Sequence, residues 1–152
     1  MNYNKIEIKI KGSNQEKWEE IKNNVISIDF PEIVPGSGDK FKNLDKLILN
    51  FKETDDNKIY DYISEWISGI TPIKEQKTVS NKKNKKLGQF IVIENSINTV
   101  DIIFYNDQAE EIFSYSFKNV YPVNMKTNTI NILGGSIERS ITFHAETDQS
   151  VS

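Results

Sequence analysis

The sequence predicts an α+β fold that is mainly β: an antiparallel β-sandwich or barrel with one flanking α-helix. Two patterns predict it. Apolar and polar residues alternate with a period of two in several short segments, as in Lys5–Lys11, where three isoleucines alternate with charged side chains. One segment, 54–70, instead has apolar residues at three- and four-residue spacing, which is typical of a helix that packs one face against a core.

The chain of 152 residues is expected to form one domain, 1–152, since domains most often hold about 100–150 residues. Within it, residues 71–88 are expected to be a lysine-rich loop insertion and residues 146–152 a polar C-terminal tail. The N-terminus alternates charged and apolar residues, unlike a secretory signal, and the apolar runs fall far short of the ~20 residues that span a bilayer. We therefore expect no membrane insertion.

Several extended segments are expected. They lie at residues 5–11, 18–30, 46–51, 90–93, 100–105, 112–121 and 136–143. Phe90–Ile93 is apolar on both faces, so we expect a central strand there. Phe113, Tyr115 and Phe117 share one face of their segment, whereas serines and a lysine share the other. We expect the aromatic face to pack in the core and the polar face to look toward water or a lumen.

The expected helix has recognisable ends. Thr54 or Asp55 can cap its start, and Asp55 and Asp56 suit the positive end of its dipole, which explains the two aspartates without a catalytic role. Gly69 and Pro72 are expected to end it. Its apolar stripe consists of Ile59, Ile63, Trp66, Ile67 and Ile70.

The residue types that most enzymes and metal sites need are scarce. The chain has no cysteine, which excludes disulfides, thiolate zinc sites and a cysteine nucleophile. Its single histidine, His144, lies opposite Ile141 and Phe143 in the last expected strand, so we expect it at a surface or interface. No phosphate-binding loop or nucleophile elbow is present, since Gly134–Ser136 lacks the lysine and helix of such a loop. We therefore expect no enzyme, no metal site and no cofactor.

Charge is distributed unevenly along the chain, whose net charge is −3. Residues 1–73 carry ten lysines and thirteen acids, a net charge of −3, and residues 74–86 carry six lysines and one glutamate, a net charge of +5. Residues 87–152 carry two lysines, one arginine and eight acids, a net charge of −5. A basic segment thus interrupts a chain whose remaining net charge is −8.

This basic segment has three interpretations. It can be a solvated loop, an inter-subunit contact with acidic side chains of another copy, or a nucleic-acid contact. No aromatic residues interleave with its lysines as stacking platforms, and the acidic remainder of the chain would repel a polyanion, so the third interpretation is the least favoured. The candidate inter-subunit lysines are Lys74, Lys77, Lys82, Lys83, Lys85 and Lys86.

A family resemblance emerges from motifs in the second half of the chain. The aromatic strand Ile112–Lys118 runs into the aromatic-Pro-Val segment Val120–Val123, and a glycine-bearing turn then leads to the final strand Ser136–Phe143. Upstream, Leu47–Phe51 is followed by an acidic turn and by the helix with its late Trp66. In these features the chain resembles the tail tube proteins of contractile-tailed bacteriophages. The lysine-rich insertion after the helix departs from that family's pattern.

The resemblance covers roughly residues 40–147 and implies a structural virion protein. Members of the family form a β-sandwich or barrel-like domain with a flanking helix. Six copies close into a ring, and rings stack into a tube that carries genome DNA when the surrounding sheath contracts. Related tubes occur in phage-derived contractile injection systems. The implied location is the phage tail, assembled in the host cytoplasm.

The implied partners are further copies of the chain, sheath and baseplate proteins, and DNA that passes through the lumen without sequence-specific binding. An acidic lumen would repel DNA phosphates and let the genome slide. The candidate lumen acids are Glu94, Asp101, Glu110, Glu111 and Glu138. Two alternatives stay open: a tube-initiating or tube-capping ring of the baseplate or neck, and, in another class, a β-rich nucleic-acid-binding module that uses the segment Lys74–Lys86.

Overall fold

The computed structural model describes residues 5–11, 15–31, 46–72, 84–87, 90–93 and 97–147. The helices of this part of the chain are α1 (Gln15–Lys22) and α2 (Lys58–Ser68). Its strands are β1 (Lys5–Lys11), β2 (Val25–Asp29), β3 (Lys46–Lys52), β4 (Ile70–Pro72), β5 (Asn84–Leu87), β6 (Phe90–Ile93), β7 (Asn98–Tyr105), β8 (Glu111–Asn131) and β9 (Ser136–Thr147).

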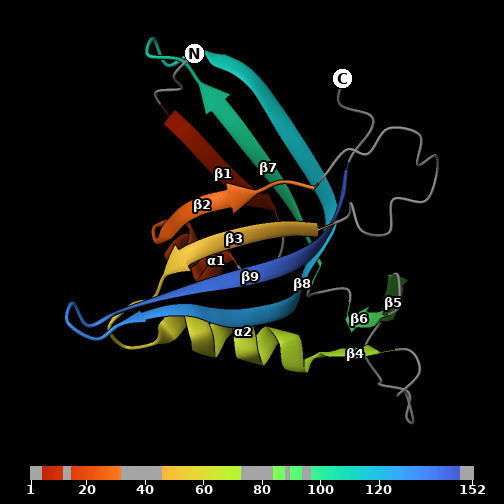
Figure 1. Ribbon diagram of the computed structural model, residues 1–152. Helices are drawn as coiled ribbons and strands as arrows, with labels where there is room; N and C mark the ends of the chain where they lie inside the picture. The colour runs from red at the N-terminus through yellow and green to blue at the C-terminus, as the bar shows by residue number, and fades with distance from the viewer. Residues whose placement is uncertain are drawn as a thin grey trace, which may run out of the picture.

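Six of the strands form one antiparallel sheet in the order β1-β7-β8-β9-β3-β2. Figure 1 shows that this sheet curls strongly, like half of a barrel, with α2 running along its lower end. Helix α2 contacts β8, and α1 contacts both α2 and β1. The predicted fold class, α+β and mainly β, is confirmed.

One apolar core fills the inner side of the curled sheet and takes in one face of each helix. Ile59, Ile63 and Trp66 of α2 are buried and Ile67 packs against the core, which confirms this part of the predicted stripe, whereas Ile70 lies in β4 because the helix ends at Ser68. Three rings meet in the core: the centroid of Trp18 lies 5.5 Å from that of Trp66 and 5.3 Å from that of Phe143. The helices are therefore held to the sheet by aromatic packing.

The expectation of an extended segment over 18–30 is wrong in its first part, where α1 lies before β2. Trp18 and Ile21 are three residues apart and both buried, so they form one face of a helical turn. Glu19 is exposed and pairs with Lys22, the Nζ and Oε1 atoms being 3.1 Å apart. The segment is rich in Glu, Lys and Gln, which favour helices, so two helices accompany the sheet instead of one.

The start of α2 follows part of the prediction. The Oγ1 of Thr54 accepts the backbone N–H of Lys58 at 3.0 Å, as expected of a capping residue. The same hydroxyl donates to Oδ1 of Asp56 at 2.8 Å, which lowers the pKa of this exposed carboxyl below its ordinary value. Asp55 lies in the same exposed turn before the helix. Gly69 follows the helix, where its N–H donates to the carbonyl of the last turn, as expected.

Strand β8 is 21 residues long and serves two partners. It pairs with β7 as far as Val120 and with β9 from Phe117 onward. Where these two stretches overlap, Asn119 has a φ of 53° and the register with β9 shifts, which marks a bulge where the strand changes direction. Beyond the bulge β8 and β9 form a long hairpin that projects from the body (Figure 1). The expected strand 112–121 thus continues to Asn131.

The β8–β9 hairpin closes through residues 132–135. Gly135 has a φ of 67°, a backbone conformation that residues other than glycine rarely adopt. Its N–H donates to the carbonyl of Asn131 at 2.8 Å. The predicted Gly134–Gly135 turn into the last strand is confirmed. Strand β9 then runs to Thr147, so residues 146 and 147 belong to the sheet and not to the polar tail expected at 146–152.

A second, three-stranded sheet has the order β4-β6-β5. Its central strand β6 confirms the expectation for Phe90–Ile93. Val92 of β6 and Tyr121 of β8 share a small buried cluster, which joins this sheet to the large one. Strands β4 and β5 fall within or beside the expected insertion 71–88, of which residues 73–83 and 88 lie outside the described residues.

Candidate assembly site

The large sheet does not close into a barrel within the described residues. Its outer strands β1 and β2 each pair on one side, and β8 has no strand partner there on its second side beyond Val120. Such edges present N–H and C=O groups to which another strand can bind. Lys5, Lys9 and Lys11 are exposed on β1 and hinder uncontrolled pairing, whereas Thr127–Asn131 of β8 has no charged side chain.

On the face of the large sheet that is turned away from the core, polar side chains of several strands are hydrogen-bonded to one another, while Ile103 and Tyr121 are buried on the same face. The Nδ2 of Asn50 donates to Oγ of Ser27 at 2.9 Å and to Oδ2 of Asp29 at 3.2 Å. The Oγ of Ser140 donates to Asn50 and accepts from Nδ2 of Asn128. These side chains link β2, β3, β9 and β8, and their chemistry suits contact with water.

The candidate lumen acids lie apart in one subunit. Asp101 is on the polar face of β7 and accepts a 2.6 Å hydrogen bond from a serine of β8. Glu110 and Glu111 are exposed where β7 leads into β8, and Glu138 is exposed near the far end of the hairpin. Glu94 lies outside the described residues. A continuous acidic lumen would thus have to combine side chains from several copies.

The candidate inter-subunit lysines are described only in part. Lys74, Lys77, Lys82 and Lys83 lie outside the described residues. Lys85 and Lys86 belong to β5, where their backbones pair opposite Val92 and Ile91 of β6. A contact between these lysines and another copy stays a prediction.

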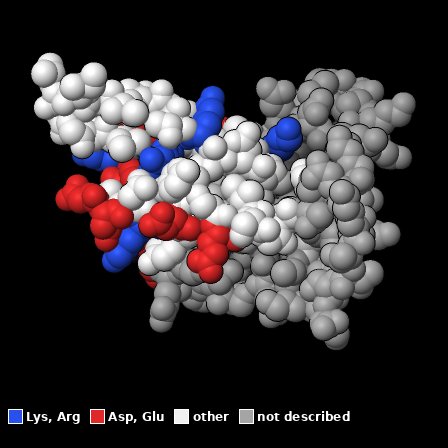
Figure 2. Space-filling model, turned by 90° about the horizontal axis from the view of Figure 1, so that it is seen from below, with Lys and Arg blue, Asp and Glu red and all other residues white. Residues whose placement is uncertain are grey.

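Helix α2 carries an acidic surface that such lysines could meet. Asp55, Asp56, Asp61 and Glu65 are exposed before and along the helix. Figure 2 shows acidic side chains gathered over this helix on the face seen from below. Lys58 moderates this charge, since its Nζ lies 3.6 Å from Oδ2 of Asp56. The surface attracts cations from outside the subunit.

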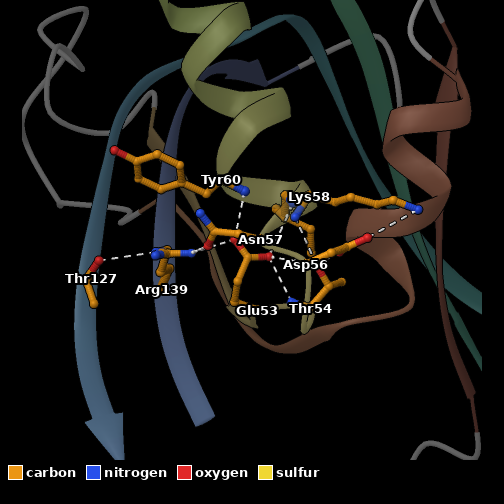
Figure 3. A network of polar contacts seen from close by, with 9 residues as sticks. Glu53, Thr54, Asp56, Asn57, Lys58, Tyr60, Thr127 and Arg139 are labelled. Atoms are coloured by element: carbon orange, nitrogen blue, oxygen red, sulfur yellow. Dashed lines mark hydrogen bonds and ion pairs between the residues drawn. The ribbon is translucent and has the colours of Figure 1, made fainter. Parts of the chain in front are cut away.

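A buried ion pair fastens the hairpin to α2 (Figure 3). The Nη1 of Arg139 on β9 lies 2.5 Å from Oε1 of Glu53 and donates to Oδ1 of Asn57 at 2.8 Å. Its Nε donates to Oγ1 of Thr127 on β8 at 3.2 Å. The guanidinium carbon lies 4.6 Å from the centroid of the Tyr60 ring. One arginine thereby links both strands of the hairpin to the helix.

Glu53 also satisfies the first backbone N–H groups of α2. Its Oε2 accepts the N–H groups of Thr54 at 2.9 Å and Ile59 at 3.2 Å, and its Oε1 accepts that of Tyr60 at 2.7 Å. The side chain of Asn57, the residue before the helix, makes no such capping bond. A negative carboxylate suits this end of a helix. Since both charges are paired and hydrogen-bonded, the network is structural.

The histidine braces the bulge of β8. The ring of His144 stacks on that of Tyr121 with centroids 4.9 Å apart. Its Nε2 lies 3.2 Å from Oε2 of Glu146, which also accepts a 2.8 Å hydrogen bond from Asn119. Burial, with a smaller contribution from Glu146, raises the pKa of Tyr121 to about 12. His144 is partly exposed on the predicted face of its strand.

Two features were not predicted from the sequence. For the ion pair of Glu53 and Arg139, the sequence contains one indication: Arg139 alternates in phase with Ile141 and Phe143, which places it on the core face of the last strand. The uncharged end of the hairpin is also indicated by the sequence, since the segment 127–137 contains no charged residue. Both signals are visible in the sequence, but neither specifies a partner.

No family model matches this chain, and no curated protein sequence matches it. Across the part of the chain that the structure describes, neither helix has the length and apolar character needed to cross a membrane.

Proposed function

We propose that this chain is a structural subunit of a phage tail tube, in which six copies close into a ring and the rings stack into a hollow conduit for DNA. The observation that carries the proposal is the curled but open sheet, whose outer strands lack a partner on one side within the described residues. Identical neighbours can supply the missing partners through repeated head-to-tail contacts, and such contacts close into rings when the rotation allows.

The two faces of the sheet support the same proposal. One face encloses the core, and the other carries the hydrogen-bonded side chains Ser27, Asn50 and Ser140 together with Asp101. A sheet with one apolar and one polar face suits the wall of a water-filled tube. In such a tube acidic side chains from all copies keep DNA phosphates from binding.

The aromatic strand Ile112–Lys118 and the aromatic-Pro-Val segment that ends at Val123 resemble those of tail tube proteins, and this resemblance favours a tail tube over other assemblies. A tube of a contractile injection system fits the same features. A tube-initiating or tube-capping ring also does, and copy number separates it from a tube subunit, since an initiator occurs in one ring per particle and a tube subunit in many.

Negative-stain electron microscopy of the purified chain tests the proposal. Rings with sixfold symmetry, or tubes built from them, are expected at high protein concentration. In particles isolated from the native source, the chain is expected as a major band that copurifies with tubes. Monomers at every concentration, together with absence of the chain from such particles, would contradict the proposal.

A further inference from the structure

The end of the β8–β9 hairpin exposes large apolar side chains, which we call the hairpin tip: Ile130, Ile132 and Leu133. Their exposed fractions are 63%, 89% and 102%. The segment 127–137 around them carries no charge, although 27% of the chain is charged. Figure 2 shows the projecting end as an uncharged lobe beside the acidic surface of α2. Apolar groups exposed together on a projection indicate a contact surface.

A second exposed apolar group, the aromatic patch, lies where β1, β7, β8 and the end of β2 meet. Tyr115 is 46% exposed, Ile6 51% and Phe30 37%. The ring of Phe30 lies 5.0 Å from that of Tyr115 and 6.4 Å from that of Phe104, and Ile6 is opposite Phe104 in the strand register. The patch is completed by Phe113, which stacks on Phe104 with centroids 4.5 Å apart.

These two groups hold six of the nine large apolar residues that are exposed in the described part of the chain. They cannot meet within one subunit. Tyr115 is the fifth residue of β8, whereas Leu133 lies two residues beyond its last residue, so roughly 50 Å of strand lies between them along the chain at about 3.3 Å per residue. The pairing of β8 with β9 prevents the tip from folding back.

We infer that the hairpin tip of one subunit docks on the aromatic patch of the next copy. The exposed side chains that make up the two surfaces are themselves uncharged and largely apolar, so a contact between them removes apolar area from water without burying a charge of their own. Tip and patch are different surfaces, so the contact is head-to-tail and every copy both gives a tip and receives one. The inference rests on the proposed self-assembly and names the surfaces that carry it.

The size of the contact fits a closed assembly better than an isolated dimer. Three side chains of this kind bury on the order of 300 Å², whereas a stable interface between two proteins takes roughly 800 Å² from each partner. The tip contact alone is too small to hold two copies together. Repeated around a ring, beside strand-edge pairing, it acts within one particle at a high effective concentration.

Disulfide cross-linking tests the inference, because the chain has no cysteine and each variant therefore carries one thiol. Leu133→Cys, enlarged by an affinity tag so that its homodimer and the heterodimer differ in mass, is mixed with an untagged second variant, Tyr115→Cys, under assembly conditions, oxidised and run on a non-reducing gel. A cross-linked heterodimer is expected. The matched control is Leu133→Cys mixed with Lys118→Cys, whose exposed thiol is on the same strand but on its opposite face, and at least tenfold less heterodimer is expected there.

A second variant tests the same contact without a thiol. Leu133→Glu changes a fully exposed side chain, so its unfolding midpoint in urea is expected to equal that of the wild type, whereas half-assembly should need at least tenfold more protein. The control is Thr142→Glu, on the polar face of β9, which shows whether a negative charge added elsewhere also raises the protein concentration needed for half-assembly.

The outcomes separate the inference from the proposed function. Particles of normal size with the tip cross-linked mainly to itself, or equally to Lys118→Cys, would overturn the inference and leave the proposed function standing. Unchanged assembly of Leu133→Glu would do the same. If the wild type forms no particle larger than a monomer under any condition tested, the proposed function and the inference both fail.

Discussion

Arg139 Nη1 and Glu53 Oε1 lie 2.5 Å apart in a buried ion pair that joins the β8–β9 hairpin to the start of α2. The side chains are 9% and 2% exposed, so neither charge is stabilised by bulk water. Glu53 accepts hydrogen bonds from backbone N–H groups in the first turn of the helix, and Arg139 donates one to the hydroxyl of Thr127 on β8. The pair therefore fixes the direction in which the hairpin leaves the body.

Removal of the arginine is expected to be costly. Arg139→Met should lower the free energy of unfolding by about 3–5 kcal/mol, since it leaves the Glu53 carboxylate buried without its cation. Urea denaturation followed by circular dichroism measures the change. Lys52→Met, at an exposed neighbouring position, should change it by less than about 0.5 kcal/mol. Equal effects of the two substitutions would show that the ion pair is not a stabilising connection.

Trp66 is the second site of expected high sensitivity. Trp66→Ala should cost about 3–5 kcal/mol, because it leaves a cavity against Trp18 and Phe143. The same denaturation experiment measures it, with Asp61→Ala on the exposed face of α2 as control and an expected change within about 0.5 kcal/mol. If Trp66→Ala lowers the free energy of unfolding by less than about 1 kcal/mol, Trp66 is not packed in the core and the buried face of α2 is wrongly assigned.

Tyr121 makes stability fall at high pH. Its pKa is raised to about 12 from 10, so in this window the unfolded chain loses the phenolic proton while the folded chain keeps it. The free energy of unfolding should therefore fall between pH 10 and 12, by up to about 2.7 kcal/mol from this group, since one pKa unit corresponds to about 1.36 kcal/mol.

The Tyr121→Phe variant lacks this group and should lose less stability over the same window than the wild type. Paired urea titrations from pH 9 upward measure the difference. Parallel declines in both proteins would contradict the assignment, because other tyrosines and lysines are common to the two chains.

The basic segment distinguishes assembly from nucleic-acid binding. If its lysines contact acidic side chains of another copy, replacing Lys82, Lys83, Lys85 and Lys86 with serine should raise the concentration needed for assembly while DNA binding stays weak before and after. A matched control replaces the exposed lysines Lys46, Lys52, Lys118 and Lys126. Tight, salt-sensitive DNA binding by the wild type that the first set of substitutions abolishes would favour the nucleic-acid module instead.

Much of the fold could be predicted because a period of two and a helical stripe are local signals. Lys5–Lys11 has the period of two and the segment through Trp66 has the helical spacing, and the structure places a strand and a helix there. Phe90–Ile93 is apolar on both faces, another local signal, and it is the central strand of its sheet as predicted. Helix α1 escaped prediction because it is only eight residues long and two buried side chains, Trp18 and Ile21, define its face. So short a helix depends on packing for its stability.

The site was less predictable because it depends on contacts between distant segments. Glu53 and Arg139 are 86 residues apart, and the bend of β8 at Asn119 depends on pairing with two different strands. The exposure of Ile132 and Leu133 follows from the projection of the hairpin. A sequence pattern would more often place such residues in a core.

The mass of the assembled particle tests the central claim, that identical copies complete one another. Native mass spectrometry of the purified chain, across a range of concentrations, should find particles of six copies or of multiples of six, with few intermediates because ring closure is cooperative. A single species with the mass of one chain at every concentration would contradict the claim. In that case the thiol of the Leu133→Cys variant should also react with a labelling reagent as fast as it does in the unfolded chain.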